Sequence, residues 1–208
     1  MKNIVFDLGG VLLRWRPREV MRAAMPQRAL SDAAADDIAH AIFQGFGGDW
    51  GEFDRGTVEP AELVARIARR TGLPPADVQA VVDVIPAELE PLAGTVALLV
   101  ALARRGHALY FLSNMPAPYA DHIERQHGFF SHFRDGVFSG RVGLIKPEPA
   151  IFELATKQFA ARAQDCLFID DVAHNIDAAR ALGWHGHHFR SAAAATLALR
   201  QLGLLQGR

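Results

Sequence analysis

Cysteine is nearly absent from this chain: Cys166, within an apolar run, is the single one among 208 residues. No disulfide can therefore form within the chain, which favours a reducing compartment, and we expect a cytoplasmic protein. Long apolar runs are also missing, and no stretch is long and apolar enough to span a bilayer. Because Asp7 interrupts the first apolar run, we expect no signal peptide.

Neither sign of charge dominates the composition. The formal net charge is −1 and no basic run stands out. Neither nucleic acid nor an anionic membrane is therefore expected as the main partner. Apolar residues make up 50% of the chain, enough for a full core in one α/β domain with an insertion or in two small domains.

Strand-like apolar runs alternate with helical patterns over most of the chain. The strand-like runs cover residues 2–6, 108–112, 136–138, 166–169 and 184–189. Strands that alternate with helices indicate right-handed βαβ crossovers and a parallel sheet with helices on both faces. We therefore predict an α/β fold with a doubly wound, Rossmann-like core.

Residues 16–89 differ in character from the rest. They contain no strand-like run, and Gly- and Pro-containing breaks separate their helical patterns. These patterns lie at about 31–44, 60–71 and 75–85. We therefore predict that 16–89 form an all-helical cap domain, inserted into a core made of 1–15 and 90–208.

Two adjacent carboxylates, Asp170 and Asp171, close the strand-like run 166–169. Adjacent like charges repel, and ionised groups at the end of an apolar strand are costly without a partner. A divalent cation relieves both costs, and paired carboxylate oxygens suit Mg²⁺. Because ligands bind beyond the carboxyl ends of parallel strands, we expect Asp7, Ser113 and this acid pair to converge at one edge of the sheet.

These groups together suit phosphoryl transfer from a small-molecule phosphate ester through a covalent aspartyl-phosphate. Asp7 is the predicted nucleophile, and Mg²⁺ held by Asp7, Asp171 and Asp170 would bridge nucleophile and phosphate. Lys146 would supply a fixed positive charge. Hydrogen bonds to the phosphate oxygens are expected from Ser113, Asn114 and the loop amides near Leu8 and Gly10.

Four motifs contain the residues for this chemistry. Because all four occur in the family's order, the chain resembles the haloacid dehalogenase superfamily over its whole length. They are Asp7-Leu8-Gly9-Gly10-Val11, Leu112-Ser113-Asn114, Lys146-Pro147-Glu148 and Ile169-Asp170-Asp171 with Asn175. With its short length and the Gly-Gly pair of the first motif, the chain resembles one branch of the family. That branch contains glucose-1-phosphate phosphatase and the N-terminal phosphatase domain of bifunctional epoxide hydrolases. The resemblance implies a helical cap and a Mg²⁺-dependent phosphomonoester hydrolase acting on a small metabolite such as a sugar phosphate.

One position departs from the pattern of the family's phosphatases. They usually carry a second Asp two residues after the nucleophile, which protonates the leaving alkoxide and then activates water; here that position is Gly9. The Gly9 carbonyl can still ligate Mg²⁺, as the family's main-chain oxygen does. General acid–base catalysis typically raises the rate about 10²–10⁴-fold. This contribution is missing at Gly9 unless another residue supplies the acid. The candidates are Asp49, Glu52 and Asp54.

Two other functions remain open. The 2-haloacid dehalogenases also lack this acid and use an Asp nucleophile on carbon without a metal. Asp170 and Asp171 argue against that reaction, because paired acids without a cation would repel an organic carboxylate. A catalytically weak binding or regulatory protein would keep the fold without the acid. Mg²⁺-dependent phosphate release distinguishes all three.

The polar segment 49–56 is interpreted as an interhelical turn within the cap. Trp50 either stacks on a sugar ring or packs inside the cap. Arg55 either reaches the closed site, where it would bind substrate, or stays in the turn. Among the histidines, His174 is expected near the phosphate, and Asn175 is expected to orient Lys146 or its loop.

Overall fold

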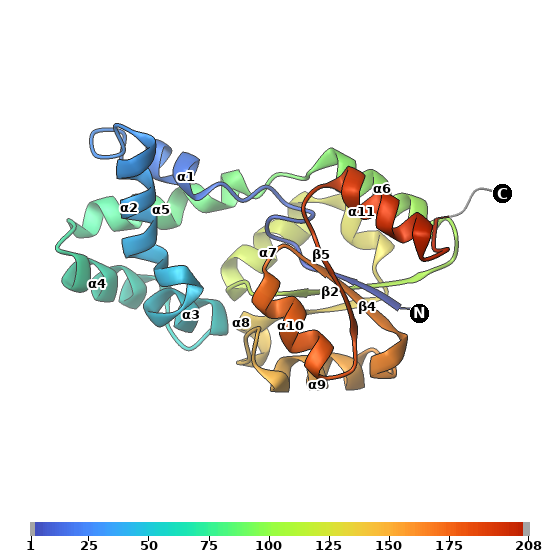
Figure 1. Ribbon diagram of the computed structural model, residues 1–208. Coiled ribbons are helices and arrows are strands. Elements are labelled where there is room, and N and C mark those ends of the chain that lie inside the picture. Colours follow the sequence, from blue (N-terminus) through green and yellow to red (C-terminus); the bar gives the residue numbers. More distant parts are fainter. Residues whose placement is uncertain (1–2, 206–208) are drawn as a thin grey trace.

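A five-stranded parallel sheet forms the centre of the computed structural model, which describes residues 3–205 apart from the side chain of Phe46 (Figure 1). The strand order is β3-β2-β1-β4-β5, and every neighbouring pair is parallel. The strands are β1 (Asn3–Phe6), β2 (Ala108–Ser113), β3 (Asp135–Phe138), β4 (Cys166–Asp170) and β5 (His185–His188). The predicted Rossmann-like α/β core is confirmed.

Helices cover both faces of the sheet because successive strand residues point to opposite sides. In β1, Ile4 and Phe6 join one buried cluster, while Val5 joins the other. The first cluster includes residues of α6 (Ala93–Ala103), α7 (Ala117–Gln126) and α11 (Ala192–Gln201), and the second those of α9 (Pro149–Gln158) and α10 (Ala173–Ala181). A short helix, α8 (Ser139–Val142), follows β3 directly. None of the helices in the described part of the chain is long and apolar enough to cross a membrane.

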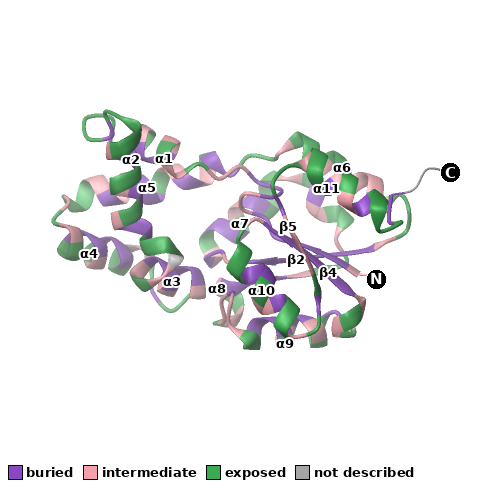
Figure 2. Ribbon diagram, viewed as in Figure 1, coloured by how far each residue is buried: buried purple, intermediate pink, exposed green. Residues whose placement is uncertain are grey.

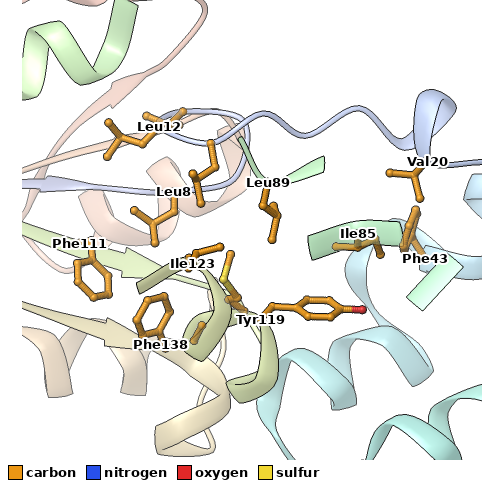
Figure 3. Packing of buried hydrophobic residues seen from close by; sticks show 14 of the residues in the cluster. Leu8, Leu12, Val20, Phe43, Ile85, Leu89, Phe111, Tyr119, Ile123 and Phe138 are labelled. Carbon is orange, nitrogen blue, oxygen red and sulfur yellow. The ribbon is translucent and has the colours of Figure 1, made fainter. Parts of the chain in front are cut away.

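Five α-helices of the described residues lie between β1 and α6 and are called the helical cap below. They are α1 (Pro17–Ala24), α2 (Asp32–Phe43), α3 (Gly48–Arg55), α4 (Pro60–Thr71) and α5 (Pro75–Glu88). The first buried cluster continues from the sheet into the cap, through Leu8, Leu89 and Ile85 to Phe43 (Figure 3). The buried surfaces of cap and core accordingly face inward, with exposed residues on the outer helix faces (Figure 2).

Two cap helices, α1 and α3, were not predicted, and the interpretation of segment 49–56 as a turn is wrong. Helix α3 has eight residues between glycines, a length at which packing rather than propensity decides helix formation. Trp50 and Phe53 supply that packing, since both are buried. Gly56 ends the helix with φ +81°, and a Cβ there would lie 2.4 Å from the carbonyl oxygen of Gly140.

Helix α5 continues past Pro86, although the sequence predicts its end at about residue 85. Proline has no N–H, so the carbonyl of Val82, four residues earlier, loses its helical donor. The hydroxyl of Tyr119 donates to this carbonyl oxygen instead, at 2.9 Å. A core helix, α7, therefore satisfies the backbone group that the proline leaves unpaired and joins the cap to the core.

Candidate active site

Three carboxylates meet at the carboxyl edge of the sheet. Asp7 follows β1, Asp170 ends β4, and these two strands are neighbours with Phe6 opposite Ile169. Oxygen atoms of Asp7, Asp170 and Asp171 all lie within 4.8 Å of one another. Three hard oxygen donors at this spacing fit the coordination that Mg²⁺ prefers.

Lys146 is fixed beside the three carboxylates. Its side chain is 1% exposed, and Nζ lies 2.9 Å from Asp7 Oδ1 and 2.7 Å from Asp170 Oδ2. Asn114 holds the Lys146 backbone: its Nδ2 donates to the carbonyl at 2.9 Å, and its Oδ1 accepts from the amide at 2.8 Å. Asn175 donates to both oxygens of Asp170. The amide side chains therefore orient this ion-pair network.

The network carries more negative charge than one ammonium group balances. Burial raises the pKa of Asp7 to about 8; Lys146 opposes this shift, while Asp170 and Asp171 add to it. Burial also raises the pKa of Asp171, again with a contribution from Asp170. Burial acts to lower the pKa of Lys146, but Asp170 and Asp7 raise it above its ordinary value. A divalent cation would favour the ionised carboxylates and so lower the pKa of Asp7.

A cavity of about 470 Å³ opens from this network toward the cap. The core contributes these polar residues to its lining: Asp7, Ser113, Asn114, Lys146, Asp171, His174 and Asn175. Apolar and aromatic residues line the remainder, among them Trp15, Trp50, Ile85, Leu89, Met115 and Tyr119. The phosphate-binding candidates and a large apolar surface therefore share one cavity.

The two predicted cap residues, Trp50 and Arg55, lie in different environments. Trp50 lines the cavity, yet it is 3% exposed and packs edge-on against Phe43 and Phe53. Arg55 points elsewhere: it pairs with Glu148 of the core at 2.5 Å and donates to the carbonyl of Gly143 at 3.3 Å. Arg55 therefore joins the cap to the core, and its binding of substrate stays a prediction.

The loop after β1 carries the backbone amides that are predicted to bind phosphate. The amide of Leu8 donates to Asp7 Oδ1 at 2.7 Å, and the amide of Gly10 donates to the carbonyl of Leu13 at 2.8 Å. Both amides therefore have partners other than a phosphate. Ser113, which is 1% exposed and lines the cavity, keeps the predicted position for a phosphate donor.

Substitutions at the two glycines of this loop are expected to differ. Gly10 has φ +73°, and a Cβ would lie 2.2 Å from Asp171 Oδ2, whereas a Cβ at Gly9 meets no atom within 4 Å. We expect Gly10→Ala to displace Asp171 and weaken metal binding or activity about 10–100-fold. Gly9→Ala is the matched control and should be tolerated. Mg²⁺ titrations of both variants measure the difference, and equal effects would contradict this reading of the loop.

Several residues that the sequence analysis missed line the cavity, notably Trp15, Ile85, Leu89 and Tyr119. Only the packing of cap against core brings them together, and no spacing in the sequence indicates it. Among the three candidate acids, the structure places Asp54 in the cavity lining. Asp49 pairs with Arg70, and Glu52 accepts a hydrogen bond from Thr57.

Comparisons with known proteins agree with this geometry. The chain is 31% identical over 202 residues to the sesquiterpene phosphatase astK of Aspergillus oryzae, covering 97% of this chain and 96% of that protein. A predicted HAD-like hydrolase from Porphyromonas gingivalis has a TM-score of 0.72 at 25% identity, covering 97% of each chain. The HAD enzyme bt-2542 from Bacteroides thetaiotaomicron, solved with magnesium and inorganic phosphate, has a TM-score of 0.70 at 23% identity, covering 91% of this chain and 94% of that one.

The family that matches the sequence spans most of the chain. Residues 1–183 match the haloacid dehalogenase-like hydrolases. This range contains all four motifs, the cap helices and the cavity described above. The predicted resemblance is confirmed: the chain belongs to the haloacid dehalogenase-like hydrolase family.

Proposed function

We propose that this protein is a Mg²⁺-dependent phosphatase that hydrolyses phosphate monoesters of apolar alcohols. One observation carries the proposal: a carboxylate–lysine network opens directly into a largely apolar cavity. The network suits the charged phosphoryl group, and the apolar lining suits the alcohol. Similarity to a sesquiterpene phosphatase supports both the phosphate group and the apolar alcohol of the proposed substrate.

Asp7 is the proposed nucleophile that forms an aspartyl-phosphate, which water then hydrolyses. Lys146 lies against Asp7 and would offset the charge that collects on the phosphoryl oxygens. The hydroxyl of Ser113 would donate to one of these oxygens. Asp7, Asp170, Asp171 and the Gly9 carbonyl would hold Mg²⁺, which supplies further charge neutralisation when bound.

The cavity favours an apolar alcohol over the sugar predicted from the sequence. Each sugar hydroxyl that is buried without a partner costs about 1–3 kcal/mol. Within the described part of the cap, Asp54 is the one charged side chain that lines the cavity. The hydroxyl of Tyr119 is already used by the Val82 carbonyl. Trp15, Trp50, Ile85 and Leu89 instead offer apolar contacts.

Phosphate release from farnesyl monophosphate and from glucose-1-phosphate, with Mg²⁺ or with EDTA, tests the proposal. We expect Mg²⁺-dependent release, with kcat/KM higher for the farnesyl ester by more than about tenfold, because burying each methylene contributes about 0.8 kcal/mol. A preference for the sugar ester would favour the alternative substrate class. Halide release from 2-haloacids in EDTA would indicate a dehalogenase, and no turnover of any substrate a binding protein.

Asp171→Ala should raise the Mg²⁺ concentration needed for half-maximal activity by at least about tenfold. The reason is that the substitution removes one of the three carboxylates in the cluster. Activity measured across a Mg²⁺ titration gives the value. Asp177→Ala, which removes an exposed carboxylate on α10, is the control. An unchanged Mg²⁺ requirement in Asp171→Ala would rule out this residue as a ligand.

Trp15→Ala should lower kcat/KM for farnesyl monophosphate by about tenfold, since the lost apolar contacts are worth roughly 1–2 kcal/mol. With 4-nitrophenyl phosphate, whose organic group is much smaller, we expect a weaker effect. Steady-state kinetics with both esters provides the comparison. Leu30→Ala, at a position that is 81% exposed, serves as the control truncation. Equal losses for the two esters would indicate that Trp15 does not contact the alcohol.

A further inference from the structure

Asp54 is a buried acid of the helical cap. It is 6% exposed and lines the cavity from helix α3. Within residues 3–205, its carboxylate neither accepts a hydrogen bond nor forms an ion pair, although buried carboxylates are usually paired. Burial raises its pKa to about 8; Lys146 opposes this shift and Asp7 adds to it. Burial thus favours the protonated form of the side chain, which faces the same space as the nucleophile.

The core, rather than the cap alone, holds Asp54 in this position. Ser139, which is fully buried, donates its hydroxyl hydrogen to the backbone carbonyl of Asp54 at 2.5 Å. The next residue, Arg55, pairs with Glu148. Gly56 then packs so closely against Gly140 that no Cβ fits. Three consecutive residues thus dock the end of α3 onto the core, and this docking fixes where the Asp54 side chain lies.

We propose that Asp54 is the general acid and base of the reaction, in place of the acid that Gly9 lacks. This inference rests on the proposed phosphatase function. In an in-line displacement the attacking and leaving oxygens lie on opposite sides of phosphorus. Asp7 attacks from the core, so the leaving oxygen departs toward the cap, and Asp54 is the acid that the cap contributes to the cavity.

Asp54 acts once in each half of the reaction. In the first, Asp7 Oδ bonds to phosphorus, the bond from phosphorus to the alcohol oxygen breaks, and the Asp54 proton moves to that oxygen. In the second, the Asp54 carboxylate takes a proton from water, whose oxygen bonds to phosphorus while the bond to Asp7 breaks. Ester and water become alcohol and phosphate, and both aspartates return to their starting states.

Asp54→Asn tests the proposal, because the amide keeps the shape of the side chain but is not an acid. The parameter kcat/KM reports formation of the aspartyl-phosphate. For farnesyl monophosphate, a poor leaving group, it should fall about 10²–10⁴-fold. For 4-nitrophenyl phosphate, whose leaving group needs no proton, it should stay nearly constant. With 4-nitrophenyl phosphate, kcat should fall instead, because the water that hydrolyses the aspartyl-phosphate is no longer activated. Nitrophenol should then be released in an initial burst.

Asp49→Asn is the matched control. It lies on the same helix, pairs with Arg70 and is not among the residues that line the cavity, so both esters should react as in the wild type. The double variant Gly9→Asp/Asp54→Asn provides a rescue test, because Gly9 lines the cavity and a Cβ there would meet no atom within 4 Å. We expect partial recovery of kcat/KM for farnesyl monophosphate, which a structural role of Asp54 would not give.

Equal losses of kcat/KM for the two esters, or no loss for either, would overturn the role of Asp54. If Asp54→Asn does not fold, kinetics of the wild-type enzyme still test the role of Asp54. With a proton donor in place, kcat/KM depends weakly on leaving-group pKa across alkyl and aryl phosphates; a steep dependence would overturn the proposal. Absence of phosphate release from every ester by the wild-type protein would instead reject the phosphatase function itself.

Discussion

Asp7→Asn is expected to lower turnover by at least about 10⁴-fold, as the loss of a nucleophile does in other enzymes. The amide oxygen of asparagine is a poor nucleophile toward phosphorus. The fold should persist, because Asn has the same shape and Lys146 keeps its ion pair with Asp170. Phosphate release measures the first effect, and thermal unfolding measures the second.

Two further observations complete this test. Asp177→Asn, an exposed substitution on α10, should leave turnover unchanged. Fluoroberyllate, which mimics the phosphoryl group of an aspartyl-phosphate, should be found on Asp7 in the wild-type protein. Near-normal turnover in Asp7→Asn would refute the covalent mechanism, whatever the substrate.

Lys146→Met should have the second-largest effect, on stability and on activity together. The substitution leaves Asp7 and Asp170 buried without their shared cation, and breaking a buried pair in this way costs about 3–5 kcal/mol of unfolding free energy. Loss of the charge near the phosphoryl group should lower kcat by about 10²–10³-fold. Chemical denaturation in EDTA and phosphate release in Mg²⁺ measure the two effects.

Mg²⁺ should stabilise Lys146→Met more than the wild type, because a cation at the acid cluster replaces part of the missing positive charge. The increase in Tm on adding Mg²⁺ is the measurement. Lys157→Met removes an exposed ammonium group from α9 and serves as the control. If Lys146→Met were as stable as the wild type in EDTA, the ammonium group would not be needed to balance the buried carboxylates.

The sequence by itself determined the core of the fold and the centre of the site. Buried apolar runs mark the strands, and polar residues that directly follow them lie at one edge of a parallel sheet. Asp7, Ser113 and Asp170 could therefore be placed together although they are far apart in the chain. Neighbouring parallel strands align their carboxyl ends, so this convergence follows from strand positions alone.

The tertiary structure alone decided how the cap meets the core. Helix α3 forms because Trp50 and Phe53 are buried, and α5 passes Pro86 because Tyr119 satisfies the freed carbonyl. The same packing gives the cavity its apolar lining and directs Arg55 to Glu148. It also places Asp54, rather than Asp49 or Glu52, in the cavity. These contacts join residues distant in sequence, and no local pattern encodes which helix face meets which neighbour, because packing overrides local propensity.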